Sequence, residues 1–251
     1  MSKSDKIIVG ISIGDLNGIG SEIVLKTFQD VRMLDFCTPV IFANVKTISF
    51  FKKQYNIDVP VHGIDTLDAI AHKKVNVLNV WKENVEINLG KEDKEIGAYA
   101  VKSLEASVKA LKNREIDVLV TAPINKSNVQ SETFNFPGHT DYLAKELEGE
   151  SLMLMISNGL RVGLLTDHVA VKDVSKTITR ERIEKKINII HKTLIQDFGI
   201  PKPKIAVLGI NPHNGDNGVI GSEDDEILIP TLTNIRNNGK LVFGPYAADS
   251  F

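Results

Sequence analysis

The chain has 251 residues, of which 42% are hydrophobic and 25% are charged. This length and composition favour a folded globular protein of one or two domains over a disordered chain. The formal net charge is −2, with acidic and basic residues interspersed, so no basic surface for nucleic acid is expected. The longest apolar runs have the length of a strand, which excludes a membrane-spanning helix from the prediction. Small molecules are therefore the expected partners.

The N-terminus and the cysteine content predict the cellular compartment. Residues 1–6 are polar and lead straight into a strand-like segment, unlike a secretory signal. Cys37 is the one cysteine and cannot form an internal disulfide. Both features favour a reducing, cytoplasmic location.

Apolar runs of strand length alternate with helical patterns along the chain. Strands are predicted at residues 6–13, 40–43, 75–80, 117–121, 152–156, 161–166, 204–210 and 241–243. Helices are predicted at residues 96–112 and 180–198, each with apolar residues every three or four positions. Thr179 is placed to cap the second helix, and Gly199 and Pro201 to end it. This order is typical of an α/β protein with helices on both faces of mainly parallel sheets.

A domain boundary is not marked by a linker. The stretch 125–138 is polar and rich in turn residues, so we place the boundary near residues 125–135. We expect an N-terminal α/β domain over residues 1–130 and a second α/β domain over residues 131–251.

Ligands of open α/β sheets bind beyond the carboxyl ends of the strands, where loops and helix N-termini converge. Four loops follow predicted strands in this way, at residues 14–20, 121–126, 166–168 and 211–218. Residues 137–141, which open a predicted helix, join them. These five segments contain the candidate site residues.

The first of these loops has the pattern G-x-x-x-G-x-G. It matches neither the dinucleotide-binding G-x-G-x-x-G nor the nucleotide P-loop, so we favour a tight strand-to-helix turn. The alternative is a functional loop, in which Gly18 and Gly20 let the backbone approach a phosphate or carboxylate beside Asp15. Lys126, in the loop after strand 117–121, is a further candidate phosphate contact.

Two histidines follow different predicted strands. His168 and His213 could meet on one divalent ion, because the strand ends bring separate loops together. The alternative is two polar loop histidines that hydrogen-bond the neighbouring backbone. The histidines at 62, 72 and 191 carry no motif.

His139 and Thr140 follow Gly138 at the predicted start of a helix. N–H donors, a hydroxyl group and a titratable ring together suit a phosphate group. The alternative is ordinary N-capping by Thr140 or Asp141.

Taken in order, the motifs resemble the 4-hydroxythreonine-4-phosphate dehydrogenase family of pyridoxal phosphate biosynthesis, over nearly the whole chain. The family's loop G-D-P-x-G-I-G-P-E is similar to residues 14–22, with differences at Leu16, Asn17 and Ser21. Its G-H-T-E segment is similar to residues 138–141, and its N-P-H-A-G-E-G-G segment to residues 211–218.

The resemblance implies a two-domain fold like that of isocitrate and isopropylmalate dehydrogenases. That fold binds its nicotinamide cofactor, NAD or NADP, without a G-x-G-x-x-G motif, and the resemblance assigns no cofactor-binding residue here. It also implies a homodimer with active sites at the subunit interface.

By the same resemblance, His139 and Thr140 bind substrate. His168 and His213 are two of three histidine ligands of a divalent cation such as Zn²⁺, Mg²⁺, Mn²⁺ or Co²⁺. Asp249, in an A-A-D-S segment similar to the family's P-A-D-T, faces the substrate as a catalytic residue. The implied reaction oxidises 4-phosphooxy-L-threonine and then decarboxylates it to 3-amino-2-oxopropyl phosphate. Either Asp249 or a metal-bound water takes the proton.

The family continues beyond the position that matches Phe251, for roughly another hundred residues by the usual size of two-domain enzymes. The third metal histidine and further substrate-binding residues lie there. We therefore expect this polypeptide to be incomplete and inactive alone.

Three alternatives stay open. A paralogous dehydrogenase would act on threonate 4-phosphate or erythronate 4-phosphate. A phosphate-binding acyltransferase would use the same broad fold without metal-binding histidines. A binding module would hold a phosphorylated ligand without catalysis.

Overall fold

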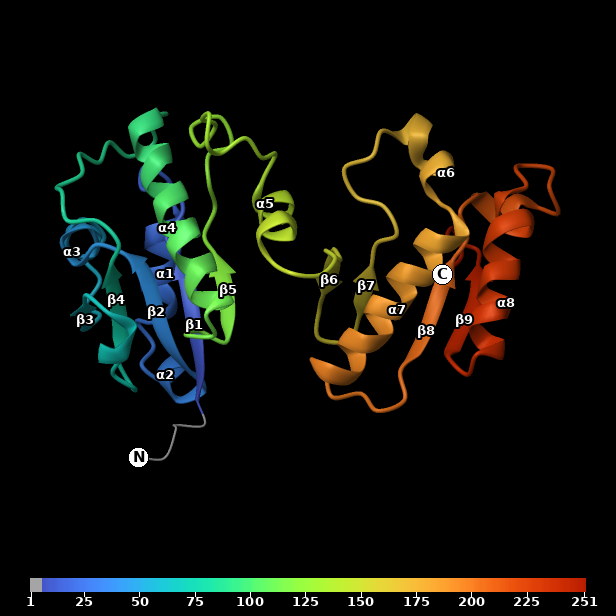
Figure 1. Ribbon diagram of the computed structural model, residues 1–251, viewed down its shortest axis with the longest axis horizontal. Helices are drawn as coiled ribbons and strands as arrows, with labels where there is room; N and C mark the ends of the chain where they lie inside the picture. Colours follow the sequence, from blue (N-terminus) through green and yellow to red (C-terminus); the bar gives the residue numbers. More distant parts are fainter. Residues whose placement is uncertain (1–5) are drawn as a thin grey trace. The chain divides into compact units, whose positions relative to one another are not determined.

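The computed structural model describes residues 6–251 (Figure 1). It forms two compact units, Met1–Glu150 and Ser151–Phe251. The boundary lies after residue 150 rather than near residue 130, because the segment after 130 packs onto the first unit. Its rings of Phe134, Phe136 and Tyr142 contact one another with centroids 5.0 to 5.3 Å apart. Phe134 and Tyr142 share a core cluster with Leu104.

The first unit contains a five-stranded sheet in the order β3-β4-β2-β1-β5, in which all neighbours are parallel. The strands are β1 (Ile7–Ser12), β2 (Cys37–Ala43), β3 (Val61–Ile64), β4 (Val75–Asn79) and β5 (Val118–Thr121). Four of them are the predicted strands with shifted ends. β3 was not predicted, because its sequence V-H-G-I has neither alternation nor a continuous apolar run.

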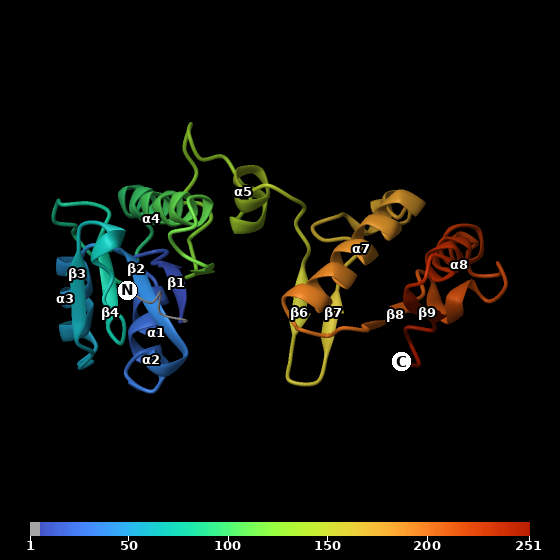
Figure 2. The ribbon, with the colours of Figure 1, turned by 60° about the horizontal axis from the view of Figure 1, so that its bottom comes forward.

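Helices cover both faces of this sheet. They are α1 (Gly20–Thr27), α2 (Met33–Phe36), α3 (Val45–Gln54), η1 (Leu67–Ala69), α4 (Lys94–Lys112) and α5 (His139–Glu146). Ile41 of β2 packs in a cluster with α1 and α3, whereas Val40 and Phe42 pack in a cluster with α4 on the opposite face. Figure 2 shows α4 running along one side of the strands. Burial on both faces explains why β2 is a continuous apolar run.

Helix α4 fixes the carboxyl end of β1. Asp93 caps the helix by accepting a hydrogen bond from the Glu95 N–H, a contact that typically stabilises by about 1 kcal/mol. Ser103, fully buried in the same helix, accepts a bond of 2.9 Å from the Ile13 N–H and donates one of 2.5 Å to the Phe42 carbonyl. Its hydroxyl group therefore joins the ends of β1 and β2 just where the first loop begins.

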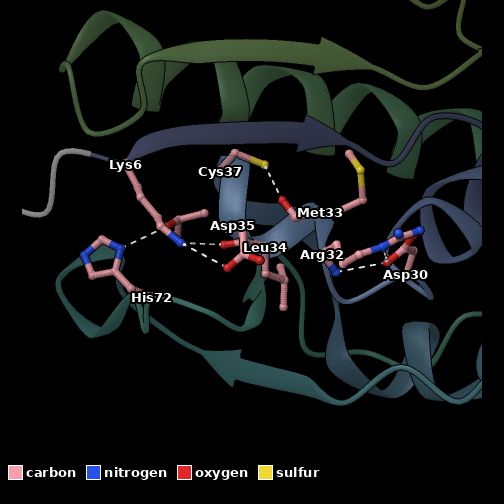
Figure 3. A network of polar contacts seen from close by, with 9 residues as sticks. Lys6, Asp30, Arg32, Met33, Leu34, Asp35, Cys37 and His72 are labelled. Carbon is pink, nitrogen blue, oxygen red and sulfur yellow. Dashed lines mark hydrogen bonds and ion pairs between the residues drawn. The ribbon is translucent and has the colours of Figure 1, made fainter.

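Polar contacts at the opposite, amino end of the sheet are structural (Figure 3). His72 Nδ1 lies 2.8 Å from Thr38 Oγ1, and Lys6 Nζ donates to the Leu34 carbonyl over 2.8 Å. The Cys37 thiol contacts the Met33 carbonyl, and burial raises the pKa of this thiol. A thiol with a raised pKa is a poor nucleophile, so packing explains Cys37.

The second unit contains two short pairs of strands. β6 (Leu154–Ile156) and β7 (Arg161–Gly163) are antiparallel, and β8 (Lys204–Leu208) and β9 (Leu241–Tyr246) are parallel. The antiparallel pair departs from the expected parallel arrangement. Its connection spans residues 157–160, closed by a Ser157 N–H to Leu160 carbonyl bond, and is too short for a crossover.

The helical segments of the second unit are η2 (Val171–Asp173), α6 (Val174–Thr177), α7 (Arg180–Gln196), η3 (Pro212–Gly215), the π-helix η4 (Asp224–Leu228) and α8 (Ile229–Asn237). In α7 the predicted cap is confirmed, because Thr179 accepts a bond from the Arg182 N–H. Its predicted apolar stripe is buried at Ile183, Ile187 and Leu194. Within residues 6–251, no helix is both long and apolar enough to cross a bilayer.

Candidate functional site

The glycine-containing loop after β1 is a close-packed turn. Gly14 has φ +70°, and a Cβ atom there would lie 2.3 Å from the Pro123 carbonyl oxygen. The Asp15 N–H donates to that same oxygen over 2.9 Å, so β1 and β5 end in contact. A Cβ at Gly20 would lie 3.0 Å from the Ile13 carbonyl oxygen, whereas one at Gly18 would meet nothing closer than 3.4 Å. Packing accounts for Gly14 and Gly20, whereas packing does not require glycine at position 18.

The side chains of Asp15 and Asn17 stabilise the same turn. Asp15 Oδ1 accepts a bond from the Asn17 N–H. The Asn17 side chain, only 3% exposed, accepts from the Asn88 N–H and donates to the Lys91 carbonyl. Asn17 therefore fastens the segment before α4 to the loop. This role could not be predicted from the sequence, because the bond partners lie more than 70 positions away.

Helix α5 begins at His139 without a side-chain cap. Gly138 is the N-cap residue, and no side chain bonds the first-turn N–H groups. The alternative of capping by Thr140 or Asp141 is therefore wrong, because both residues lie inside the first turn. The helix N-terminus keeps donors that an anion can use.

Lys126 lies next to this helix start. A Cβ at Gly138 would lie 3.7 Å from Lys126 Cε, and the Lys126 charge acts on the His139 ring. Burial, and then the Lys126 charge, lower the pKa of His139 below its ordinary value of 6.5. His139 Nε2 is buried without a hydrogen-bond partner. Lys126, the unpartnered His139 Nε2 atom and a helix N-terminus thus lie together in the first unit, and Thr140 belongs to the first turn of that helix.

The loop after β8 has an unusual backbone. Its six consecutive residues from His213 to Gly218 all have φ between +46° and +87°. The left-handed region costs roughly 1–2 kcal/mol for an ordinary L-residue, and less for Asn and Asp. Strain of this kind collects at functional sites and needs support from the surrounding structure.

Asp249 holds the His213 side chain. Its Oδ2 atom lies 2.9 Å from His213 Nδ1, and its Oδ1 atom accepts a bond of 3.3 Å from the His213 N–H. Hydrogen bonds from the Asp249 and His213 backbone N–H groups, with the His213 charge, lower the pKa of Asp249. The His213 ring therefore contacts a carboxylate rather than neighbouring backbone, and its Nε2 atom is not used in this pair.

His168 follows the β6–β7 pair, is exposed and has φ +48°. Like His213 and Asp249 it belongs to the unit Ser151–Phe251, whereas His139, Thr140, Lys126, Asp15, Gly18 and Gly20 belong to Met1–Glu150. Residues 6–251 contain no group of three or more His, Cys, Asp or Glu side chains arranged to hold a metal ion. A metal site at His168 and His213 thus stays a prediction.

An apolar groove of about 720 Å³ lies in the second unit between β7, α7 and β8. Its walls include Leu164, Ile187, Ile190 and Ile205, and neither His168 nor His213 lines it. Most of its lining is apolar and it contains none of the candidate site residues, so the groove is separate from the candidate site.

Comparison with known proteins connects these loops to one family. Residues 35–251 match the family model described as pyridoxal phosphate biosynthetic protein PdxA. A 4-hydroxythreonine-4-phosphate dehydrogenase from Bacteroides thetaiotaomicron is 41% identical over 251 residues, which cover 99% of this chain and 69% of the relative. One from Sulfurihydrogenibium sp. is 34% identical, covering 96% of this chain and 74% of the relative. A Clostridium botulinum (strain Hall) protein, provisionally named D-threonate 4-phosphate dehydrogenase, is 30% identical. The match covers 98% of this chain and 75% of the relative.

Solved structures agree with this assignment. A 4-hydroxythreonine-4-phosphate dehydrogenase from Burkholderia phymatum superposes with a TM-score of 0.84 at 26% identity, covering 98% of this chain and 75% of that one. A terephthalate 1,2-cis-dihydrodiol dehydrogenase from Burkholderia xenovorans LB400 shares the fold, with a TM-score of 0.65 at 24% identity and coverage of 98% and 75%. The predicted isocitrate/isopropylmalate dehydrogenase-like α/β fold is confirmed. The chain belongs to the pyridoxal phosphate biosynthetic protein PdxA family, as its ordered motifs predicted.

Proposed function

We propose that the protein oxidises the secondary alcohol of 4-phosphooxy-L-threonine with NAD or NADP and that the product loses carbon dioxide to give 3-amino-2-oxopropyl phosphate. This reaction serves the biosynthesis of pyridoxal phosphate. Family membership supports the reaction class, and the unpartnered His139 imidazole beside Lys126 is the observation that carries the substrate assignment.

The phosphate end of the substrate binds at the start of α5. Lys126 supplies a positive charge, Thr140 a hydroxyl group, and the helix its free N–H groups. A nearby phosphate favours protonated imidazole, so binding raises the pKa of His139 and turns Nε2 into a charged donor. Asp15, Gly18 and Gly20 form the loop after the neighbouring strand β1 and are further candidate contacts.

The proposed metal ligands belong to the unit Ser151–Phe251. His213 fits a metal ligand, because metal-bound histidines commonly donate their other ring nitrogen to a carboxylate, as Nδ1 can to Asp249. His168 and His213 would hold a divalent cation, such as Zn²⁺, Mg²⁺, Mn²⁺ or Co²⁺. When bound, that cation supplies a Lewis acid that makes the substrate hydroxyl group easier to deprotonate.

Asp249 acts on the reaction through His213. Its carboxylate has a lowered pKa and contacts the His213 ring and backbone, so it is a weak base in this arrangement. We therefore propose that Asp249 orients His213, and we prefer this role to the direct proton abstraction that the family resemblance suggested. The family's dimeric, cytoplasmic organisation, with active sites at the subunit interface, is part of the same proposal.

A second candidate substrate is D-threonate 4-phosphate, favoured by the relative from Clostridium botulinum. The two acids share the phosphate group and the secondary alcohol, and they differ in the amino group. Contacts to the phosphate group therefore do not distinguish them, so substrate choice needs a direct comparison.

The test is formation of reduced nicotinamide by the complete gene product, with Mn²⁺ and either NAD or NADP. Each of 4-phosphooxy-L-threonine, D-threonate 4-phosphate and erythronate 4-phosphate is supplied in turn. We expect the highest kcat/KM with 4-phosphooxy-L-threonine. A higher value with either sugar acid would replace the proposed substrate, and no oxidation of any of the three would overturn the dehydrogenase assignment.

A further inference from the structure

A buried carboxyl group lies beneath the loop that carries His213. Asp224 is fully buried, and its Oδ1 atom accepts a bond of 2.8 Å from the Ile210 N–H. Its Oδ2 atom accepts bonds from the Asn211 N–H at 2.9 Å and from Asn211 Nδ2 at 3.1 Å. A carboxylate only accepts hydrogen bonds, so three converging donors match this side chain.

The backbone around Asp224 is shaped for this contact. A Cβ at Gly209 would lie 3.2 Å from Asp224 Oδ1 and 2.2 Å from Asn214 Oδ1, so only glycine lets both side chains approach. Asp224 begins the π-helix η4, and such irregular turns are frequent at functional sites. The Glu226 carbonyl of this turn accepts a bond from the Arg180 side chain, which fastens η4 to α7.

Asp224 fixes the chain two residues before His213. Pro212 is the only residue between Asn211 and His213, and its ring restricts the backbone there. The loop is fastened again beyond the histidine, where the Ile220 N–H donates to the Gly215 carbonyl. The Asp224 carboxylate therefore holds the backbone just before the left-handed segment 213–218. Asp249 holds the ring of His213, the first residue of that segment.

We propose that Asp224 is a positioning residue for His213, which keeps the left-handed loop in the conformation that lets this imidazole bind the divalent cation. This inference rests on the proposed function for the metal, but its structural part does not need a bound ion. Asp224→Asn would replace one of the two acceptor oxygens by an NH2 donor, so the part-buried N–H group of either Ile210 or Asn211 would lose its acceptor. The loop would then relax away from its left-handed conformation.

The competing explanation is that Asp224 only stabilises the fold. Leu228, in the same π-helix, is fully buried in the core and does not contact the loop through a hydrogen bond. Leu228→Ala is therefore a matched variant that destabilises the unit without removing the acceptors. Asp225→Asn, at an exposed neighbouring position, controls for loss of one negative charge.

The experiment compares Asp224→Asn, Leu228→Ala and Asp225→Asn in the complete gene product. Amide hydrogen exchange is measured by NMR without metal, and Co²⁺ affinity is measured from visible absorption in competition with a chelator. We expect Asp224→Asn to accelerate exchange of the His213 amide at least tenfold relative to amides of α7. We also expect it to weaken Co²⁺ binding by roughly 10- to 100-fold, the usual range for an outer-shell residue. Leu228→Ala should accelerate exchange evenly across the unit and leave Co²⁺ affinity within about threefold of the parent at a temperature where it is folded.

The positioning role would be overturned if amide exchange of His213 were unchanged in Asp224→Asn. It would also be overturned if Asp224→Asn and Leu228→Ala had equal effects on amide exchange and on Co²⁺ affinity. Failure of the parent protein to bind Co²⁺ would instead contradict the proposed metal function. In that case the exchange comparison still decides whether Asp224 holds the loop.

Discussion

His213 Nδ1 lies 2.9 Å from Asp249 Oδ2, and the backbone N–H of the same histidine donates to Asp249 Oδ1. One carboxylate therefore holds both the ring and the main chain of a residue with φ +52°. Thirty-six positions separate the two residues, which are joined through the ends of the parallel strands β8 and β9.

Replacing Asp249 tests this pair. Asp249→Asn keeps a similar shape but removes the charge that favours Nδ1–H, so we expect Mn²⁺ or Co²⁺ affinity to fall roughly 10-fold or more. Asp216→Asn is the control, because Asp216 is an exposed carboxylate in the same left-handed loop. Equal metal affinity in the Asp249 variant and its parent would show that the pair does not orient a ligand.

Replacing Lys126 tests the phosphate site. Lys126→Met removes the charge beside the start of α5, and loss of one charge-assisted contact of about 1.5 kcal/mol weakens phosphate binding roughly tenfold. Titration of inorganic phosphate, followed by chemical shifts of the His139 ring, measures this affinity. Lys74→Met, at an exposed position on the same unit, should leave it unchanged. Equal losses in both variants would indicate only a general effect of charge.

The lowered pKa of His139 predicts a pH dependence of stability. Above its ordinary pKa of 6.5 the imidazole is neutral in both the folded and the unfolded chain. Below 6.5 the unfolded chain binds the proton first, so the free energy of unfolding falls until the pH passes the folded pKa. Urea unfolding at several pH values measures this slope, and His139→Gln should flatten it. An unchanged slope in His139→Gln would contradict the lowered pKa, and His62→Gln serves as the histidine control.

Ser103 and Ser107 provide a matched pair in α4. Ser103→Ala leaves the buried Ile13 N–H without an acceptor and should cost about 1–3 kcal/mol of the free energy of unfolding. Ser107 is also fully buried but bonds only the Leu104 carbonyl of its own helix, so Ser107→Ala should cost roughly 1 kcal/mol or less. Urea unfolding of the two variants measures both losses of free energy of unfolding. Equal losses would show that Ser103 has no special role in joining β1 and β2.

Gly14 and Gly18 separate packing from ligand binding in the first loop. Gly14→Ala places Cβ 2.3 Å from a backbone oxygen at φ +70°, so we expect it to destabilise by at least about 2 kcal/mol. Gly18→Ala meets nothing closer than 3.4 Å and should fold normally. If Gly18→Ala also binds phosphate like the parent, this loop does not contact the substrate phosphate.

The sequence predicted the fold where local pattern and burial agree. The apolar stripe of α7, the cap at Thr179 and the strands buried on both faces were confirmed. β3 and the antiparallel pairing of β6 with β7 were not foreseen, because V-H-G-I has no pattern and pairing direction depends on the connection.

The candidate site residues could be predicted from the sequence, but the residues that position them could not. His139 and His213 were found from ordered motifs at strand and helix ends. Their partners were not, because Asp224 and Asn17 act through hydrogen bonds to distant or irregular backbone. Asp224 lies within the run Glu223-Asp224-Asp225-Glu226, in which nothing in the sequence distinguishes the buried member from the other three.

Product stoichiometry tests the central claim most directly. The complete gene product is incubated with 4-phosphooxy-L-threonine, the preferred nicotinamide cofactor and Mn²⁺, and reduced nicotinamide and released carbon dioxide are measured together. Oxidation followed by decarboxylation predicts equal amounts of the two products. Formation of reduced nicotinamide without carbon dioxide, or of neither product, would contradict the proposed reaction.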